Sequence, residues 1–215
     1  MIYNISYLIF ILEYIFLNKE EKLSKNKFSK QMILDASFEI LKEKGIEFIT
    51  AREIAKKLNS SVIPIFSNYA NMEELRIDLM QKASEIYSSY ISEGEQCSPK
   101  FKGTGLAYIK FAKNEPNLFK FIFMHKTPTN KSVMEDFCNG EHISEHILEI
   151  VQKSTNLTAK NAQKLYFYNW LFVHSIACMV ATDFCTFSDE EISEMVSFEY
   201  VSLLEQFKKV EKPNA

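Results

Sequence analysis

The chain has 215 residues, of which 47% are apolar and 25% charged, with only 5 glycines and 5 prolines. This composition predicts an ordered, helix-rich protein and argues against a β-sandwich or a disordered chain. The formal net charge of −3 opposes phosphate binding over the whole surface, so any nucleic-acid surface has to be local.

The cysteine pattern argues against two kinds of small scaffold. The four cysteines, Cys97, Cys138, Cys178 and Cys185, show no paired spacing of the CxxC kind. Neither a zinc knuckle nor a disulfide framework is therefore expected, and a reducing cytoplasm is the simplest location.

Residues 1–27 form an apolar N-terminal extension and a basic linker. The segment from Ile2 to Leu17 carries Glu13, has no basic start and is shorter than the roughly 20 residues of a membrane-spanning helix. Three interpretations stay open: a helix packed on the body or on a partner, upstream residues included by a misjudged start codon, and a membrane anchor, which is the least favoured. The polar run Lys19 to Lys30 is interpreted as a solvated linker in preference to a basic arm beside DNA, because Glu20 and Glu21 dilute its charge.

Two helices are predicted directly after the linker. Apolar residues from Ser29 to Lys44 follow helical spacing, and Gly45 stands where a left-handed residue would end the helix. Thr50 and Glu53 then have the Thr-x-x-Glu spacing of a capping box, in which hydroxyl and carboxylate both bind free amides. A short second helix should therefore run from Ala51 to about Leu58.

A turn and two further helices follow. Asn59 tolerates a positive φ, so we expect a tight turn into a third helix that is capped by Ser61. Pro64 would lie in the first turn of that helix, where its missing amide has little effect. Asn71 and the glutamates after it repeat the capping signal, and helical spacing continues from Met72 to about Ser92.

The rest of the chain is predicted to be helical, which makes the fold class all-α. Each further segment begins near a Ser, Thr, Asn or Pro start signal. No glycine-rich phosphate loop, nucleophile elbow or internal repeat is present, so neither an enzyme nor a cofactor is expected. The predicted helices are Phe101–Lys113, Pro116–His125, Ser132–Lys153, Thr158–Thr182 and Ser188 to about Lys209.

Two short helices joined by a tight turn and supported by a preceding helix form a helix-turn-helix unit. The residues that carry this unit are Ile33-Leu34-Asp35-Ala36, Gly45, Thr50-Ala51-Arg52-Glu53-Ile54-Ala55, Ser61, Ile65-Phe66, Tyr69 and Glu73-Glu74-Leu75. Across about 45 positions they resemble the TetR family of transcriptional regulators. A second segment, Trp170 to Ala177, resembles the Trp-x-x-x-His-Gly segment of one group of TetR-family ligand domains.

The resemblance implies a DNA-binding domain at 28–75 and a ligand-binding and dimerisation domain at 76–215. It implies a repressor that leaves a palindromic operator when a small apolar or aromatic effector binds. Ile54, Ala55, Leu58, Ile65 and Tyr69 would be core residues. Thr50 and Arg52 are expected to contact the phosphate backbone of the DNA. The residues expected to face the major groove are Ser61, Val62, Ile63, Pro64, Phe66, Ser67 and Asn68, and Met72 is also expected to contact DNA.

Three positions depart from the family pattern. Phe66 replaces the usual tyrosine, Met72 replaces the usual lysine, and Asn59 replaces the turn glycine. These replacements lower the expected affinity for DNA. The third helix offers Val62 and Ile63 to the bases, and the thymine methyl group suits such apolar contacts, so an A·T-rich operator is predicted. A TetR-shaped dimer that has lost operator binding is the alternative.

The C-terminal region is rich in aromatic residues, most of which any helical core could explain. The resemblance places a ligand cavity between the long helices, and such cavities are usually apolar with a few polar groups. It also places a homodimer interface on the last two helices, with ligand shifting the long Met72–Ser92 helix and so the two DNA-binding heads. The predicted ligand-binding residues are Tyr87, Tyr108, Phe111, Phe123, Trp170 and His174.

Two weaker patterns compete with this interpretation. His142, Glu145 and His146 fit the H-x-x-E-H pattern of one class of zinc peptidases, but the match is short and has no partner motif, so chance placement is favoured and no metal is predicted. Cys178 and Cys185 could share a helix face as a redox sensor, but no basic residue adjoins them to stabilise a thiolate, and unreactive buried cysteine is favoured.

Overall fold

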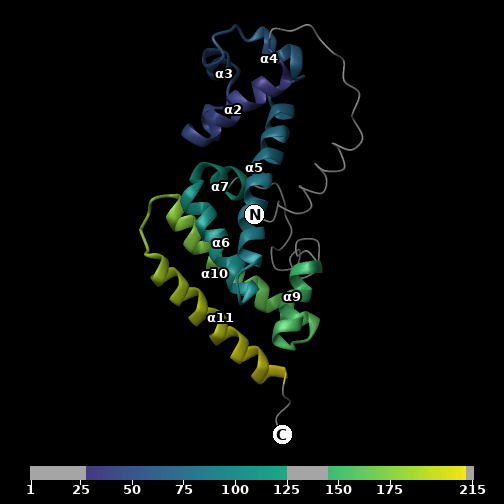
Figure 1. Ribbon diagram of the computed structural model, residues 1–215, viewed down its shortest axis with the longest axis vertical. Coiled ribbons are helices and arrows are strands. Elements are labelled where there is room, and N and C mark those ends of the chain that lie inside the picture. The colour runs from purple at the N-terminus through teal and green to yellow at the C-terminus, as the bar shows by residue number, and fades with distance from the viewer. Residues whose placement is uncertain (1–27, 125–144, 212–215) are drawn as a thin grey trace.

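The computed structural model describes residues 28–124 and 145–211, and the side chains of the same ranges except 145–148. The N-terminal extension and the H-x-x-E-H pattern lie outside the described side chains. All regular elements in the described part are helical, which confirms the predicted all-α class (Figure 1). None of these helices is long and apolar enough to cross a membrane. The elements are α2 (Lys30–Lys44), the 3₁₀ turn η1 (Ile46–Phe48), α3 (Ala51–Lys57), α4 (Ile63–Asn68), α5 (Met72–Glu95), α6 (Lys100–Asn114), α7 (Pro116–Phe123), α9 (Glu145–Thr155), α10 (Ala159–Ala181) and α11 (Asp189–Glu211).

Helices α2, α3 and α4 form a small head at one end of the molecule (Figure 1). Ser29 begins α2, where its hydroxyl accepts a hydrogen bond from the Met32 amide at 3.2 Å. Gly45 ends it with φ +95°, which favours glycine, although its ψ of 176° makes the cap extended and not the predicted left-handed one. Inward-facing apolar residues of all three helices, Ile33, Leu41, Ile54, Ile65 and Tyr69 among them, make the head core.

The predicted capping box at α3 is half formed. The Thr50 hydroxyl accepts from the Glu53 amide at 3.2 Å, as expected. The Thr50 amide, however, donates to the Phe48 carbonyl at 2.9 Å, so the Glu53 carboxylate has no amide to cap and lies 3.7 Å from the Lys44 ammonium. The preceding 3₁₀ turn η1 therefore replaces the carboxylate half of the box.

The turn between α3 and α4 contains Asn59, whose φ of 48° confirms the predicted positive value. Helix α4 begins one step later than the sequence suggests, because Val62 occupies the capping position. The Ser61 hydroxyl still accepts from the Ile63 amide, but over 3.4 Å. Pro64 lies in the first turn, as predicted.

Helix α5 connects the head to the larger helical body (Figure 1). It begins with a complete capping box: Asn71 accepts from the Glu74 amide at 2.9 Å, and the Glu74 carboxylate accepts from the Ala70 amide at 2.7 Å. The helix passes without a break through the predicted domain boundary at 75/76 and continues to Glu95. The head and the body are thus joined by one rigid element.

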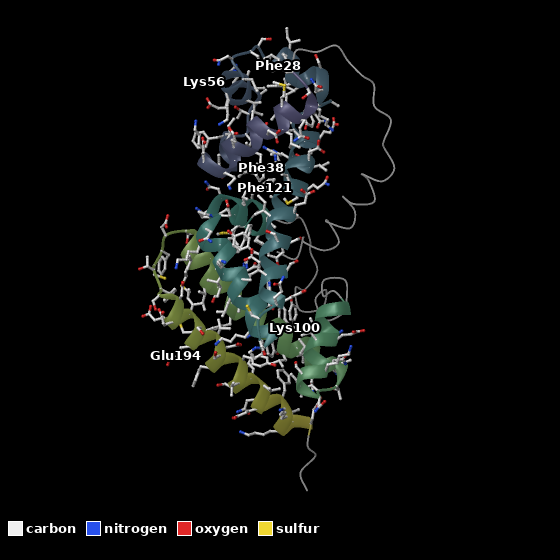
Figure 2. All side chains as sticks on the ribbon, in the orientation of Figure 1. Phe28, Phe38, Lys56, Lys100, Phe121 and Glu194 are labelled. Carbon is white, nitrogen blue, oxygen red and sulfur yellow. The ribbon has the colours of Figure 1, made fainter. Side chains whose placement is uncertain are left out.

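In the body, α6 packs between α5 and α10, while α11 runs along the outside of α10 (Figure 1). The main core is continuous from the head to the body, and α7 bridges the two. Figure 2 shows Phe38 of α2 and Phe121 of α7 at this junction, and both are buried. A smaller apolar cluster around Phe101, Val151 and Leu165 joins α6, α9 and α10.

Helices α5 and α6 cross at two glycines with almost no space between their backbones. A Cβ atom on Gly103 would lie 2.1 Å from the Gly94 carbonyl oxygen, and one on Gly94 would lie 2.6 Å from the Gly103 carbonyl oxygen. The obstructing atoms are backbone atoms that cannot rotate away. Glycine is therefore required by the close approach, although it is unfavourable inside a helix.

We expect Gly103→Ala to lower the free energy of unfolding by roughly 1–3 kcal/mol, because the added methyl group forces the two helices apart. Urea denaturation followed by circular dichroism measures this change. Gly105→Ala is the matched control: its Cβ would meet Val173 at an ordinary 3.5 Å, so the higher helix propensity of alanine should leave stability unchanged or raised. Equal stability of both variants would contradict the proposed constraint.

Candidate DNA interface and aromatic cluster

The head presents an apolar surface on α4. Ile63 is 70% exposed, Phe66 50% and Val62 36%, while Ile65 between them is fully buried. Large apolar side chains that stay exposed on a short helix commonly mark a surface for binding. The three side chains lie where the sequence predicted contact with the bases.

The other residues predicted to contact DNA differ in whether their polar groups already have hydrogen-bond partners in the protein. Thr50 is exposed but its hydroxyl caps α3, and the exposed Ser67 hydroxyl donates to the Ile63 carbonyl at 2.9 Å. The half-buried Asn68 amide donates to the Phe28 and Pro64 carbonyls, so this amide already has partners within the head. Met72 is also half-buried and packs against the main core. Both side chains are thus engaged within the head, and their contact with DNA stays a prediction.

Most cations of the head are already paired with carboxylates. Lys30 contacts Asp78 at 2.9 Å, Lys42 contacts Glu115 at 2.9 Å, and Lys57 contacts Glu39 at 2.8 Å. Burial lowers the pKa of Lys30, but hydrogen bonds to Asp78 and Glu74 outweigh it, so the pKa is raised. These lysines have little charge left over for phosphates.

Arg52 and Lys56 differ from the other head cations. Both are exposed on α3, and neither forms an ion pair with any carboxylate in the described part of the chain (Figure 2 labels Lys56). They are four residues apart, so they lie on the same face of the helix. Lys56 was not predicted from the sequence: only the structure separates it from its neighbour Lys57, which α2 carboxylates neutralise.

The six residues predicted for ligand binding come together in one aromatic cluster in the body. The ring of Tyr87 lies edge-on to Tyr108, Phe111 and Phe123, with centroids 6.0, 5.4 and 5.2 Å away. Trp170 stacks on His174 with centroids 4.8 Å apart. Phe119, which was not predicted, packs 5.6 Å from Tyr108 and 5.8 Å from His174. We call these seven residues the aromatic cluster.

A chain of hydrogen bonds passes through this cluster. The Trp170 side chain bonds the Tyr108 hydroxyl, which lies 2.8 Å from Nδ1 of His174. Burial raises the pKa of Tyr108 well above its usual value, so the hydroxyl keeps its proton and donates it to Nδ1. The His174 proton then belongs on Nε2, which lies 3.3 Å from the Cys178 sulfur. Tyr108 and His174 thus fix each other's orientation.

His174 stays neutral because burial lowers its pKa to about 4. The sequence suggested that nothing basic adjoins Cys178, and the structure corrects this, since His174 lies beside it. A neutral imidazole does not stabilise a thiolate, and burial raises the pKa of Cys178 as well. Cys185 lies beyond the end of α10 at Ala181, so the two cysteines do not share a helix face. The favoured prediction of an unreactive Cys178 fits this environment.

The low pKa of His174 predicts a specific dependence of stability on pH. Between the unfolded value near 6.5 and the folded value near 4, the unfolded chain binds a proton that the folded chain does not. Stability is therefore full above pH 6.5 and decreases by about 3 kcal/mol as the pH falls to 4. Urea denaturation across this range should show the decrease, and His174→Gln should show a flatter profile. A wild-type profile as flat as that of His174→Gln would contradict the buried neutral imidazole.

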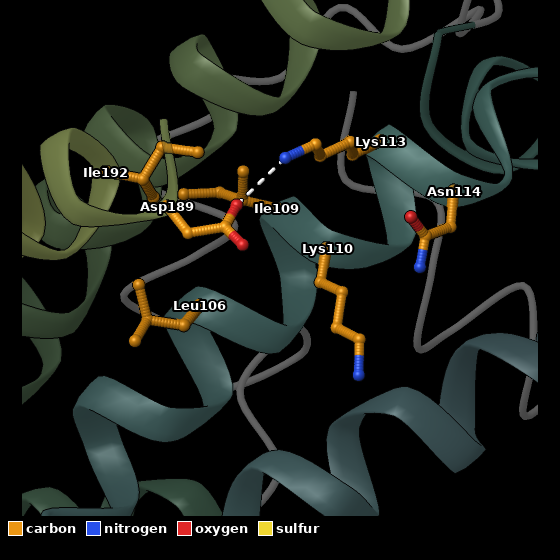
Figure 3. A pocket seen from close by; sticks show the side chains of 7 residues that line it. All are labelled: Leu106, Ile109, Lys110, Lys113, Asn114, Asp189 and Ile192. Atoms are coloured by element: carbon orange, nitrogen blue, oxygen red, sulfur yellow. Dashed lines mark hydrogen bonds and ion pairs between the residues drawn. The ribbon is translucent and has the colours of Figure 1, made fainter. Parts of the chain in front are cut away.

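Two hollows lie near the helices of the body. A cavity of about 70 Å³ is bounded by part of the aromatic cluster, including Tyr87, Tyr108 and Trp170. A groove of about 320 Å³ between α6 and the start of α11 has Leu106, Ile109 and Ile192 in its lining and Lys110 and Lys113 beside them (Figure 3). Lys113 is paired with Asp189 at 2.8 Å. The sequence analysis missed this groove, because it depends on how α11 packs on α6.

The overall arrangement is similar to that of a solved structure. A TetR-like transcriptional regulator from Rhodococcus sp. RHA1 superposes with a TM-score of 0.60 over 86% of this chain and 99% of its own length, at 12% sequence identity. The chain has the TetR-like fold. The sequence resemblance to the TetR family is thereby confirmed at the level of the fold.

Sequence comparison finds a relative that is described as a helix-turn-helix regulator. The uncharacterised HTH-type transcriptional regulator YvkB of Bacillus subtilis (strain 168) is 30% identical over 118 residues. The match covers 50% of this chain and 62% of YvkB, which is less than two thirds of the relative. No family model matches the chain. Within the TetR-like fold, α3 and α4 are the helix-turn-helix pair and α5 connects them to the body.

Proposed function

We propose that the chain is a ligand-responsive transcriptional regulator, most simply a repressor, that binds a palindromic double-stranded DNA operator as a homodimer. The observation that carries this proposal is the surface of the head: an exposed apolar face on α4 beside two cations on α3, Arg52 and Lys56, that have no carboxylate partner among the described residues. Unpaired cations bind phosphates without regard to sequence, whereas side chains in the major groove select bases. The head has side chains of both kinds, namely two cations for the phosphates and an apolar face for the bases.

The homodimer would form through α10 and α11. Their outer faces expose Tyr168 and Leu171 on α10 and Phe198 and Val201 on α11, although both helices are packed on their inner sides. Apolar residues exposed along two adjacent helices are typical of an interface that a second copy covers. A twofold dimer would hold two heads at a fixed separation.

Two helices would carry the effect of a ligand from the aromatic cluster to the head. Helix α5 contributes Tyr87 to the cluster and is continuous with the head. Helix α7 contributes Phe119 and Phe123, and its start contacts the end of α2: Glu115 pairs with Lys42, and Asn117 donates to the Lys42 carbonyl at 2.8 Å. A ligand that prefers one position of α5 and α7 would change the separation of the heads.

An anisotropy titration against DNA from upstream of the protein's own gene, repeated over a series of salt concentrations, tests the proposal. We expect sequence-selective binding that weakens with salt, and Arg52→Ala and Lys56→Ala should each reduce the salt slope by about 1. Lys57→Ala is the matched control, because Lys57 is neutralised by Glu39 and should leave the slope unchanged. Weak binding that ignores sequence and all three changes would refute operator binding.

The alternative function is a TetR-shaped ligand-binding dimer without an operator. The half-buried Met72, at the position where the family usually has lysine, and the net charge of −3 favour it. In that case ligand binding and dimerisation would persist in the titrated protein while selective DNA binding would be absent.

A further inference from the structure

The polar run that precedes the head is anchored at the end of α4. The Phe28 carbonyl accepts a hydrogen bond from the Asn68 amide at 3.2 Å, and Asn68 is the last residue of α4. Phe28 also packs against the main core, and Figure 2 shows it at the same outer end of the head as Lys56. Because α4 has 6 residues, its two ends are only about 9 Å apart. The chain before Phe28 therefore begins beside the surface that we propose to face DNA.

The described residues near this anchor offer little charge to a phosphate. Lys30 contacts Asp78 at 2.9 Å, and Arg76 contacts Glu73 at 3.7 Å. The two head cations that have no carboxylate partner among the described residues both lie on α3. Phosphate contacts fix the orientation of a protein on the duplex, so contacts from α3 alone would leave the end of α4 without support.

The sequence directly before Phe28 contains the charge that this end of the head lacks. Between Glu21 and Phe28 the run holds three lysines and no acid, so the glutamates that dilute its charge lie only at its far end. Lys25, Asn26 and Lys27 immediately precede Phe28 and lie outside the described residues. Lysine and asparagine side chains can donate hydrogen bonds to the acceptors that A·T pairs expose in the minor groove. These three residues therefore suit the minor groove of an A·T-rich site.

The length of this segment matches the distance that it would have to cover. An extended chain advances at most about 3.6 Å per residue, so Lys25 can lie roughly 10 Å beyond Phe28, and its side chain adds to that reach. The major groove is about 12 Å wide. A segment that starts at the edge of this groove has to cross only one phosphate backbone to enter the neighbouring minor groove.

We propose that Lys25, Asn26 and Lys27 form an arm that enters the minor groove next to the major groove contacted by α4. This inference rests on the proposed function and adds a second DNA-contacting element to the same interface. The hydrogen bond between Asn68 and Phe28 fixes the base of the arm. The narrow minor groove of an A·T tract has an enhanced negative potential, which attracts lysine side chains. The arm thus extends the expected A·T preference to base pairs that α4 does not touch.

Anisotropy titrations of the full chain with its operator over a salt series test the arm. We expect Lys25→Ala/Lys27→Ala to reduce the salt slope by about 2, because each lysine displaces counterions from the DNA. Lys100→Ala/Lys102→Ala is the matched control. It removes two lysines with the same spacing from the start of α6, and Figure 2 shows Lys100 in the body, away from the head. We expect this control to leave the salt slope unchanged.

Base substitutions beside each half-site show which groove the arm occupies. A pair of inosine and cytosine lacks the guanine amino group, so its minor groove resembles that of A·T while its major groove resembles that of G·C. Replacing the flanking A·T pairs with G·C should weaken binding of wild type about fivefold or more, whereas inosine–cytosine pairs should have little effect. Lys25→Ala/Lys27→Ala should distinguish much less between the two substitutions.

The outcomes separate failure of the arm from failure of the proposed function. If wild type binds DNA selectively but Lys25→Ala/Lys27→Ala keeps its salt slope, the arm is refuted and the regulator stands. Equal effects of G·C and inosine–cytosine pairs on wild type would show that the arm does not read the minor groove, and would overturn the inference. An absence of selective binding by wild type would refute the proposed function, and the arm with it.

Discussion

Replacing Phe198 with glutamate is expected to convert the proposed homodimer into a monomer and to weaken operator binding by at least about 100-fold. Phe198 is 75% exposed on the outer face of α11, so its removal leaves the fold of one chain intact. In a dimer the two copies of this side chain would lie in a closed apolar interface, where a buried unpaired charge is strongly unfavourable. A monomer would bind only one half-site at a time. It would therefore lose the additional affinity that comes from two linked heads binding both half-sites at once.

Analytical ultracentrifugation of wild type and Phe198→Glu measures the oligomeric state, and anisotropy with a palindromic operator measures affinity. Met32→Glu is the control, because Met32 is also exposed and apolar but lies on α2 in the head. We expect Met32→Glu to remain dimeric. A dimeric Phe198→Glu would show that α11 does not form the interface.

Replacing Ile63 with aspartate is expected to abolish selective DNA binding, again by about 100-fold or more. Ile63 is 70% exposed and lies at the start of α4, so the fold should lose less than about 0.5 kcal/mol of stability. A carboxylate in the major groove would face the phosphates and the acceptor-rich base edges. Ile63→Asn is the matched control of equal size, and we expect it to weaken binding by about tenfold through loss of apolar contact.

The predicted preference for thymine gives this experiment a second readout. Replacing thymine by uracil in the operator removes the C5 methyl group and leaves the hydrogen-bonding edges unchanged. Wild type should lose affinity for uracil-substituted sites, whereas Ile63→Asn should lose much less. An equal loss of affinity in both proteins on uracil substitution would show that Ile63 does not contact a thymine methyl group. Unchanged affinity of Ile63→Asp for the operator would show that α4 does not enter the groove.

Some parts of the structure followed from the sequence alone because their causes are local. The hydroxyl of Thr50 and the amide of Asn71 cap amides three residues away, and Asn59 adopts a positive φ within a single turn. Such contacts lie within one helical turn, so residue type and spacing were enough to place the helix-turn-helix unit and the long connecting helix. The family resemblance then indicated the right fold.

Other features were decided only by tertiary packing, because they depend on residues far apart in the chain. Lys56 is available for DNA and Lys57 is not, since carboxylates of α2 neutralise Lys57 alone. The Asn68 amide bonds the Phe28 carbonyl, 40 positions earlier, in addition to the nearby Pro64 carbonyl, and only the second of these contacts is local. The neutral state of His174 on α10 results from its burial against Tyr108 of α6 and Phe119 of α7. Periodicity predicts which residues face inward, but it does not predict which partner each one meets there.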